Sequence, residues 1–510
     1  MEQSKQPAQI QKLATGIFGF DLITNGGLPQ GRTTLISGTA GSAKTVLAAQ
    51  FLAEGIRTRR EAGVFVTFEE SPDDIRRNMN SLGWDIVAWE SEGQWLFVDA
   101  SPQLGEEIEV SGNYDLGALL ARIEHAVRKI GARRVSLDSL GAVFARFQNN
   151  ALIRHELLRI ATVLKRLEAT TVMTAERTEE YGNIARFGVE EFVADNVVIL
   201  RNILEEEKRR RTIEVLKFRG TNHQKGEFPF TIALQQGITV IPLSALELKQ
   251  RSSNIRIPSG IPELDSMCGG GFFRDSIVLV SGATGTGKTL MVTEFLEGGA
   301  AQNDRCLLLA FEESREQLFR NANGWGVDFE RLEREGLLHV ICAYPESASL
   351  EDHLLRIKAE LDTFSPARVA IDSLSALERV ASAKGFREFV IGLTSFIKQR
   401  EVAGLLTSTA PTLMGGTSVT EAHISTLTDS IILLRYVEMY GEVRRGLTVL
   451  KMRGSMHDKD IREFTIDGTG MHIGKPFRTV TGILSGSPTY TTSSELERLD
   501  HLFQNDAQKG

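Results

Sequence analysis

Short apolar runs alternate with longer amphipathic segments along the whole chain. The first half contains the runs RTTLISG, VFVTFEE, RRVSLDSL and TTVMTAE, and the second half contains DSIVLVSG, CLLLAFEE, ARVAIDSL and GLLTSTA. Segments with helical spacing of their apolar residues, TVLAAQFLAEGI and TLMVTEFLEGGA, follow the first run of each half. Strands spaced by helices predict an α/β fold in which a mostly parallel sheet is covered on both faces. A ligand is then expected at the carboxyl ends of the strands.

The second half repeats the first half in the same order. TGIFGFDLITNGG matches SGIPELDSMCGGG, and a shift of 244 residues carries Lys44 to Lys288. VSLDSL matches VAIDSL, and EVLKFRGTNHQK matches TVLKMRGSMHDK, at a shift of 234 residues. These ordered matches predict two homologous domains joined by the polar segment LELKQRSSNIRI. The expected division is a first domain over 1–245, a linker over 246–257, a second domain over 258–488 and a tail over 489–510.

The composition fits a soluble globular protein of several domains. Of 510 residues, 42% are hydrophobic and 24% are charged, and the formal net charge of −8 disfavours nucleic-acid binding. Cys268, Cys306 and Cys342 lack a metal-binding spacing, and we expect them to be reduced and buried. No apolar run reaches the length of a membrane span, and the start of the chain has no signal-peptide pattern. We therefore expect a cytoplasmic protein that does not bind membranes.

The chain contains two candidate phosphate-binding loops. GATGTGKTL, from Gly282, fits the pattern G-x-x-x-x-G-K-[ST], whereas GTAGSAKTV, from Gly38, has Ala43 in place of the last glycine. Backbone N–H groups at a helix N-terminus favour a triphosphate, the lysine reaches the outer phosphates, and the threonine hydroxyl binds Mg²⁺. The extra Cβ is costly if this position needs φ > 0 and tolerable if it is helical. We expect both loops to bind ATP and Mg²⁺, with altered turnover at the first.

The expected ATP contacts of these loops are Gly41, Ser42, Ala43, Lys44, Thr45 and Val46 in the first domain and Thr284, Gly285, Thr286, Gly287, Lys288, Thr289 and Leu290 in the second, with Thr45 and Thr289 also as metal ligands.

Paired glutamates follow the second predicted strand of each half, as Glu69-Glu70 and Glu312-Glu313. One carboxylate of a pair can polarise an attacking water or hydroxyl while its neighbour orients it or acts through Mg²⁺, for which Glu312 is a candidate ligand. A lone acidic pair is often only a solvated turn, but its recurrence at the same place in both repeats favours catalysis. Asp138 and Asp372 end apolar strands and are expected to contact the water shell of the metal.

The segments KFRG and KMRG place Lys217 with Arg219, and Lys451 with Arg453, on one face of a strand, because residues two apart point to the same side. Such a pair can act as an arginine finger on the phosphates of a neighbouring subunit. A solvated basic edge that prevents strand pairing is the alternative. The repetition favours the functional interpretation, and the further expected ATP contacts in these segments are Phe218, Thr221, His223 and Lys225 in the first domain and Met452, Ser455, His457 and Lys459 in the second.

These motifs together resemble the KaiC family of cyanobacterial circadian-clock proteins. The resemblance rests on both loops, the two FEES segments, IARFGVEEFVADNVVILRN, KFRGTNHQKGE, AIDSLSAL, HISTLTDSIILLRYVE and KMRGSMHDK, and it runs almost end to end. It implies two tandem RecA-like P-loop NTPase domains with mostly parallel central sheets. It also implies a double-ring homohexamer with nucleotide at every subunit interface, slow ATP hydrolysis in the first ring, and serine/threonine autokinase and autophosphatase activity in the second.

The two halves differ where the family carries its phosphoacceptors. At the shift of 234, Ser425-Thr426 fall opposite Glu191-Phe192, so only the second half offers hydroxyls there. Ser425 and Thr426 resemble the two family phosphoacceptors, and Thr420 resembles a threonine proposed as a transient phosphate relay. The resemblance also implies five nucleotide-site contacts outside the motifs: Ser81 and Leu82 in the first site, the ring of Trp325 against adenine in the second, and Arg379 and Arg445 near phosphate in the second ring.

The C-terminal segment TYTTSSELERLDHLFQNDAQKG departs from the family tail that binds the activator KaiA, so we do not expect KaiA to be required. Ser494 and Glu497 can form a capping box ahead of an apolar helical face, which favours either a frayed terminal helix or a short coiled coil joining two hexamers. The other partners that the resemblance implies are a KaiB-like protein and a downstream histidine kinase or other output protein. Two alternative functions stay open: a RecA-like DNA recombination ATPase and a nucleotide-gated scaffold without phosphorylation.

Overall fold

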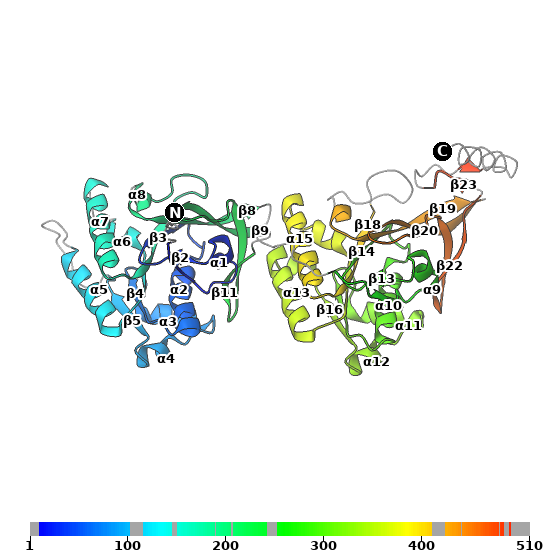
Figure 1. Ribbon diagram of the computed structural model, residues 1–510, viewed down its shortest axis with the longest axis horizontal. Coiled ribbons are helices and arrows are strands. Elements are labelled where there is room, and N and C mark those ends of the chain that lie inside the picture. The colour runs from blue at the N-terminus through cyan, green and yellow to red at the C-terminus, as the bar shows by residue number, and fades with distance from the viewer. Residues whose placement is uncertain are drawn as a thin grey trace, which may run out of the picture. The chain divides into compact units, whose positions relative to one another are not determined.

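The computed structural model describes residues 10–101, 116–144, 150–188, 190–205, 208–241, 252–410, 424–439, 441–478, 480–483 and 489–490. The chain forms two compact units, Met1–Leu246 and Glu247–Gly510. Each unit contains a nine-stranded sheet with helices on both faces (Figure 1). No helix in the described part of the chain is long and apolar enough to cross a membrane.

The sheet of the first unit has the order β11-β10-β9-β8-β3-β7-β6-β4-β5, in which β8 through β5 are parallel and β9, β10 and β11 extend the sheet in antiparallel fashion. The strands are β3 (Thr33–Gly38), β4 (Gly63–Thr67), β5 (Trp95–Asp99), β6 (Arg134–Asp138), β7 (Thr170–Glu176), β8 (Asn196–Glu205), β9 (Lys208–Phe218), β10 (Glu227–Ala233) and β11 (Gly237–Val240), with a separate pair of β1 (Lys12–Leu13) and β2 (Leu28–Pro29). The helices are α1 (Phe20–Ile23), α2 (Lys44–Arg59), α3 (Pro72–Asn80), α4 (Ile86–Ser91), α5 (Gly117–Ile130), α6 (Leu140–Phe144), α7 (Asn150–Arg166) and α8 (Glu190–Val193).

The second unit repeats this order as β16-β15-β17-β18-β14-β19-β20-β21-β22. Its strands are β14 (Ile277–Gly282), β15 (Cys306–Ala310), β16 (Leu338–Cys342), β17 (Arg368–Asp372), β18 (Ala403–Thr409), β19 (Ser430–Met439), β20 (Glu442–Met452), β21 (Arg462–Asp467) and β22 (Gly470–Pro476), with the pairs β12 (Arg256–Ile257) and β13 (Phe272–Phe273), and β23 (Val480–Thr481) and β24 (Thr489–Tyr490). Its helices are α9 (Pro262–Met267), α10 (Lys288–Ala300), α11 (Arg315–Gly324), α12 (Phe329–Arg334), η2 (Pro345–Ser347), α13 (Leu350–Phe364), α14 (Leu374–Glu378), α15 (Ala383–Gln399) and η3 (Ile424–Thr426).

The central parallel strands of each sheet are buried on both faces, which explains the continuous apolar runs of the sequence. Every residue of β3 and of β14 is buried. On β4, Phe65 packs into the core on the α2 side, whereas Val64 and Val66 pack into a second core with α5 and α7. The predicted fold class, two tandem α/β domains with mostly parallel sheets, is confirmed. One detail differs, because Cys342 is half-buried while Cys268 and Cys306 are buried as expected.

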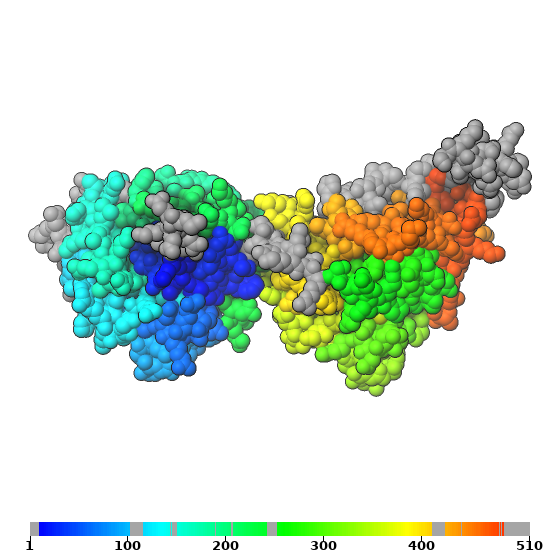
Figure 2. Space-filling view, in the orientation of Figure 1, coloured from blue at the N-terminus to red at the C-terminus, as the bar shows by residue number. Residues whose placement is uncertain are grey.

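The loop after β20 packs back onto the start of its own repeat. Figure 2 shows the orange surface of β19 and β20 lying against the green segment around α9. The backbone N–H of Asp458 donates to the carbonyl of Met267 at 2.8 Å, and Arg256 donates to the Ser455 hydroxyl at 2.6 Å. The first unit repeats the contact, since the N–H of Gln224 donates to the carbonyl of Ile23 at 2.7 Å. The basic segments are therefore anchored at both ends in each unit.

Candidate active site

Both phosphate-binding loops join the central strand of a sheet to the helix that follows it. The first loop lies between β3 and α2, and the second between β14 and α10. Lys44 Nζ donates to the carbonyl of Thr39 at 3.0 Å, and Lys288 Nζ donates to the carbonyls of Gly282 and Ala283 at 2.9 Å and 3.0 Å. Burial lowers the pKa of both lysines. Each lysine is thus folded back over its own loop, next to the backbone amides that suit an anion.

Ala43 lies in the left-handed region of backbone conformation, with φ 73° and ψ 28°. Gly287, its counterpart, has φ 105° and ψ 19°. Of the two possibilities that the sequence left open, the position therefore needs φ > 0. The methyl group of Ala43 packs against the same apolar core as Val46 and Ile232, so the loop keeps its backbone path.

The aspartates that end β6 and β17 bind the threonines that follow the loop lysines. Asp372 accepts hydrogen bonds from Thr289 at 2.8 Å and from Thr407 at 2.5 Å. Asp138 accepts from Thr174 and Thr45 in the same way. Burial raises the pKa of both aspartates. In each unit a threonine hydroxyl therefore lies in contact with a buried carboxylate, and this is where we expect the metal from the sequence.

The glutamate pairs stand directly before a helix in each unit, because the serine of FEES caps that helix. Ser71 accepts from the N–H of Asp74 at the start of α3, and Ser314 forms a capping box with Gln317 at the start of α11. Each pair lies in the short turn between the strand end and the capping serine. They are consequently held at the carboxyl edge of the sheet.

The two members of each pair have different partners. The first member accepts a hydrogen bond from the serine after the strand-end aspartate, Ser139 to Glu69 and Ser373 to Glu312, at 3.0 Å in both units. Arg379 also donates to Glu312 at 2.9 Å, and its predicted place near phosphate stays a prediction. The peptide bonds that precede these serines are cis.

The second member of each pair is held by an asparagine that the sequence reasoning missed. Asn321 donates to Glu313 at 3.1 Å, and Asn78 donates to Glu70 at 3.4 Å. Burial raises the pKa of Glu313 and Glu70. Both asparagines occupy the same place in the repeat, in FEESPDDIRRN and FEESREQLFRN, and this recurrence is the signal that could have identified them.

In the second unit the loop and carboxylates line one cavity of about 400 Å³. Trp325, which follows α11, and Arg445, from β20, line this cavity, and their contacts with adenine and phosphate stay predictions. The Arg445 Nε atom is buried and has no hydrogen-bond partner within the described residues. In the first unit, Ser81 caps the end of α3 and Leu82 packs against the core at the equivalent place. The full lining of the cavity is Thr284, Gly285, Gly287, Lys288, Thr289, Leu290, Ala310, Glu312, Glu313, Leu318, Asn321, Trp325, Asp372, Thr409, Arg445 and Ile466.

The basic segments lie at the opposite edge of each sheet. Strand β9 ends at Phe218, whose partner is Asn196 at the amino end of β8, and β20 ends at Met452, whose partner is Ser430 at the amino end of β19. Arg219 and Arg453 lie just beyond these strand ends, so the expectation that each shares a strand face with its lysine is wrong. The remaining predicted members lie in the loops that follow: Thr221, His223 and Lys225, and Ser455, His457 and Lys459. The structure therefore does not bring these residues to the phosphate-binding loop of their own chain.

The predicted acceptor turn lies beside the basic segment of its own unit. Ser425 and Thr426 belong to η3, just before β19. Lys451 Nζ donates to the carbonyls of Ser425 and Thr428 at 2.7 Å each, and Arg453 donates to the carbonyl of Thr426 at 3.0 Å. In the first unit Lys217 likewise donates to the carbonyls of Glu191 and Ala194. The predicted relay residue Thr420 lies outside the described residues.

Comparison with known proteins agrees with this geometry. The chain matches the family described as "ATPase: KaiC" over residues 13–245 and 257–477. It is 69% identical to the circadian clock protein KaiC3 of Synechocystis sp., over 97% of this chain and 98% of that protein. It is 58% identical to the circadian clock oscillator protein KaiC of Parathermosynechococcus lividus, over 97% and 91%, and 56% identical to that of Synechococcus elongatus, over 98% and 96%. The family match includes both loops and both sheets, and the chain belongs to the KaiC family of ATPases.

Proposed function

We propose that this ATPase is also a serine/threonine autokinase and autophosphatase, and that it works as a homohexamer with two rings of nucleotide sites. The observation that carries the proposal is the place of the basic segments. Strand β14 has six residues, so its loop end and its amino end lie roughly 16 Å apart. Lys451 and Arg453 consequently reach a phosphate at Lys288 only if it belongs to another copy of the chain. A closed ring of head-to-tail contacts completes every site in this way.

The cavity of the second unit has residues suited to ATP with Mg²⁺. Lys288 and the loop amides face the phosphates, Thr289 and Glu312 offer oxygen ligands, and the ring of Trp325 forms a flat wall for adenine. Among the residues that the structure describes, no group of three or more His, Cys, Asp or Glu side chains could hold a metal by itself. That agrees with Mg²⁺, which usually takes one or two protein ligands together with substrate phosphates. When bound, Mg²⁺ offsets the negative charge of the outer phosphates.

The glutamate pairs supply the proton acceptor in both units. In the first unit, Glu69 and Glu70 accept a proton from water as its oxygen bonds to the γ-phosphorus and the bond to ADP breaks. In the second, Glu312 and Glu313 do the same for a hydroxyl of Ser425 or Thr426 from the adjacent subunit. Lys451 holds the acceptor turn through two carbonyls, and Arg453 lies next to it, so the hydroxyls and the trans-acting cations arrive on one surface.

Several parts of the proposal come from the relatives, whose names describe circadian clock proteins. We propose that this chain acts as a circadian or timer-type signalling core in the cytoplasm. We further propose a KaiB-like partner, an output protein such as a histidine kinase, and a phosphate-relay role for Thr420. The tail after Pro488 is proposed to join two hexamers. Because this tail differs from the KaiA-binding tail of the family, autophosphorylation is proposed to proceed without KaiA.

The test of this function is the intact mass of the full-length protein after incubation with ATP and Mg²⁺ alone. We expect one and two added phosphates, located on Ser425 and Thr426. The Glu312→Gln, Glu313→Gln double variant is expected to stay unphosphorylated, and the single variants assign the proton acceptor within the pair. Protein that remains unphosphorylated until a KaiA-like factor is added contradicts the proposed autonomy. Protein that is never phosphorylated while it still hydrolyses ATP favours the nucleotide-gated scaffold.

A further inference from the structure

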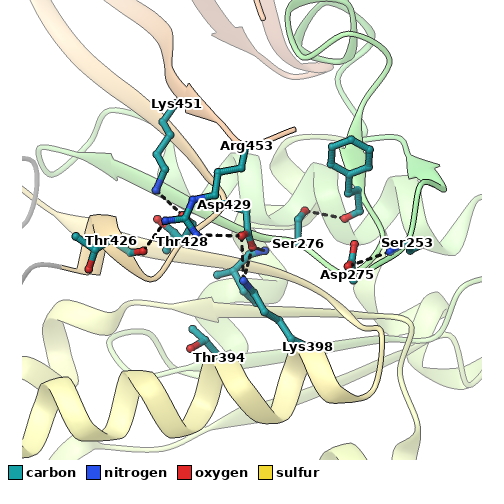
Figure 3. A network of polar contacts seen from close by, with 12 residues as sticks. Ser253, Asp275, Ser276, Thr394, Lys398, Thr426, Thr428, Asp429, Lys451 and Arg453 are labelled. Atoms are coloured by element: carbon teal, nitrogen blue, oxygen red, sulfur yellow. Dashed lines mark hydrogen bonds and ion pairs between the residues drawn. The ribbon is translucent and has the colours of Figure 1, made fainter. Parts of the chain in front are cut away.

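A cluster of charged side chains lies beside the acceptor turn (Figure 3). Asp429, which follows the turn, has a side chain that is 17% exposed. Lys398, from α15, places Nζ 2.7 Å from one carboxylate oxygen and 2.9 Å from the other. The N–H of Ile277, the first residue of β14, donates to the same carboxylate at 2.9 Å. The carboxylate is thus held by a helix and by the strand that carries the phosphate-binding loop.

Arg453 lies next to this carboxylate but forms only a loose ion pair with it. Its Nη1 atom is 3.8 Å from Oδ1 of Asp429, whereas a direct charged hydrogen bond is about 2.8 Å long. Its Nη2 atom donates to the carbonyl of Thr426 instead, and its side chain is 55% exposed. The guanidinium is therefore turned toward the acceptor turn and solvent, on the surface that the proposed neighbour covers.

We propose that Lys398 is a positioning residue, which neutralises Asp429 and so keeps Arg453 available for phosphate. Lys398 contacts both carboxylate oxygens, which leaves the aspartate little attraction for a second cation. Lys451, the other nearby cation, is engaged by two backbone carbonyls. If Lys398 loses its charge, Arg453 needs to move only about 1 Å to pair directly with Asp429. Since Lys398 acts through the trans role of Arg453, the inference rests on the proposed function.

The first unit offers a natural comparison. Its equivalent aspartate, Asp195, lies 3.8 Å from Lys165 and 3.9 Å from Arg219. The Lys165 side chain is 60% exposed, whereas that of Lys398 is 18% exposed. The close, half-buried lysine–aspartate pair thus occurs in the unit that carries acceptor hydroxyls. It does not occur in the unit that carries Glu191 and Phe192 in their place.

The test compares rates of autophosphorylation in full-length protein by intact mass. Lys398→Met keeps the apolar length of the side chain and removes its charge. We expect it to slow phosphorylation of Ser425 and Thr426 about tenfold, a typical coupling between neighbours in one ionic network. The KM for ATP should not change, because the loop and cavity are intact. Lys165→Met is the matched control in the first unit, and we expect it to leave first-ring ATP hydrolysis unchanged.

The double variant separates positioning from a structural role. In Lys398→Met with Asp429→Asn, the competing charge is gone, so we expect most of the rate to return. A structural role predicts a double variant at least as slow as the single one, and that result would overturn the inference, as would a wild-type rate in Lys398→Met. If Lys398→Met does not assemble, Asp429→Asn alone decides: a rate equal to or above wild type supports the inference, and a loss contradicts it.

The Arg453→Met variant distinguishes a failure of the proposed trans action of Arg453 from a failure of the proposed role of Lys398. A wild-type rate in Arg453→Met contradicts the proposed trans action itself. An inactive Arg453→Met together with a normal Lys398→Met contradicts only the role of Lys398.

Discussion

Ala43 adopts the backbone conformation that glycine adopts in the second loop, with φ 73° against 105° at Gly287. A left-handed conformation costs a residue with a Cβ roughly 1–2 kcal/mol. The contact of its methyl group with the apolar core of the first unit offsets part of that cost. The geometry of the first loop is therefore kept, and Lys44 lies over it as Lys288 lies over the second loop.

Ala43→Gly should consequently change little. It relieves the left-handed strain but gives the unfolded chain more freedom, and these effects oppose each other within about 1 kcal/mol. We expect unchanged nucleotide occupancy of the first loop, measured by chromatography of nucleotide released from denatured hexamers. Lys44→Ala is the matched variant that should lose both this occupancy and ATP-dependent assembly. A large gain of occupancy in Ala43→Gly, or full occupancy in Lys44→Ala, contradicts the account of this loop.

Individual site residues differ in how far the sequence could predict them. The loop residues and strand-end carboxylates follow fixed spacings, because backbone geometry at a strand end dictates them. Asn78 and Asn321 were recoverable from their recurrence in the repeats. The pairing of Lys398 with Asp429 was not, since it joins a helix to a distant strand end and depends on how α15 packs against the sheet.

The helices that follow the two loops are joined to a terminal hairpin by related but different residues. In the first unit Gln50 accepts from the N–H of Ile238 at 2.7 Å and donates to the carbonyls of Gln236 and Ile238. In the second, Glu294 stands in place of Gln50 and accepts from the N–H of Met471 at 2.6 Å. Its other oxygen is buried without a hydrogen-bond partner among the described residues. Only a protonated glutamate can donate there as the glutamine does.

Glu294 should therefore make the stability of the second unit depend on pH. Burial, chiefly, raises its pKa from 4.5 to about 7; Glu297 and Glu263 add to the rise, whereas the Met471 N–H and His472 oppose it. Between these values the folded unit keeps a proton that the unfolded chain has lost. The contribution of Glu294 to stability is thus fully present below about pH 4.5 and is lost as the pH rises to about 7. We expect Glu294→Gln to remove this decrease and to stabilise the unit above pH 7 by up to roughly 3 kcal/mol.

Thermal unfolding of the full-length protein across this pH range measures the effect. Gln50→Glu is the reciprocal variant, and it should introduce the same pH dependence into the first unit. A Glu294→Gln profile parallel to that of the wild type shows that the carboxyl titrates normally. Because α10 begins at Lys288, hydrogen exchange at the β21–β22 hairpin reports whether loss of the proton also loosens the contact between the hairpin and this helix.

The parallel part of each sheet was predictable from apolar runs, but the antiparallel extension was not. Strands such as β3 are buried on both faces and read as continuous apolar segments. Strand β9, with the sequence KRRRTIEVLKF, begins with four basic residues and is only partly buried. Strand β9 is held in place by its long antiparallel pairing with β8. Its charged residues hide the alternation of apolar and polar positions by which a strand is recognised in a sequence.

The molecule as a whole separates the two parts of each nucleotide site. The loop, carboxylates and Trp325 lie at the carboxyl edge of the second sheet, while Lys451, Arg453 and the acceptor turn lie at the amino edge. In the proposed ring, one subunit contributes the bound nucleotide and its neighbour contributes both the cations and the hydroxyls. This proposal makes assembly and chemistry inseparable, because the described residues of one chain do not bring these two parts together.

A mixture of two defective proteins tests this division. Lys288→Ala cannot hold nucleotide in its second loop, and Arg453→Met lacks the trans-acting cation; each protein alone should be unphosphorylated. They are mixed without nucleotide and assembled by adding ATP and Mg²⁺, which the intact first loops bind. At mixed interfaces an Arg453→Met subunit supplies ATP and a Lys288→Ala subunit supplies Arg453, Ser425 and Thr426. Intact mass distinguishes the two chains, and we expect phosphate on the Lys288→Ala chain only. Phosphate on the Arg453→Met chain, or on neither chain in assembled hexamers, would contradict a site shared between subunits.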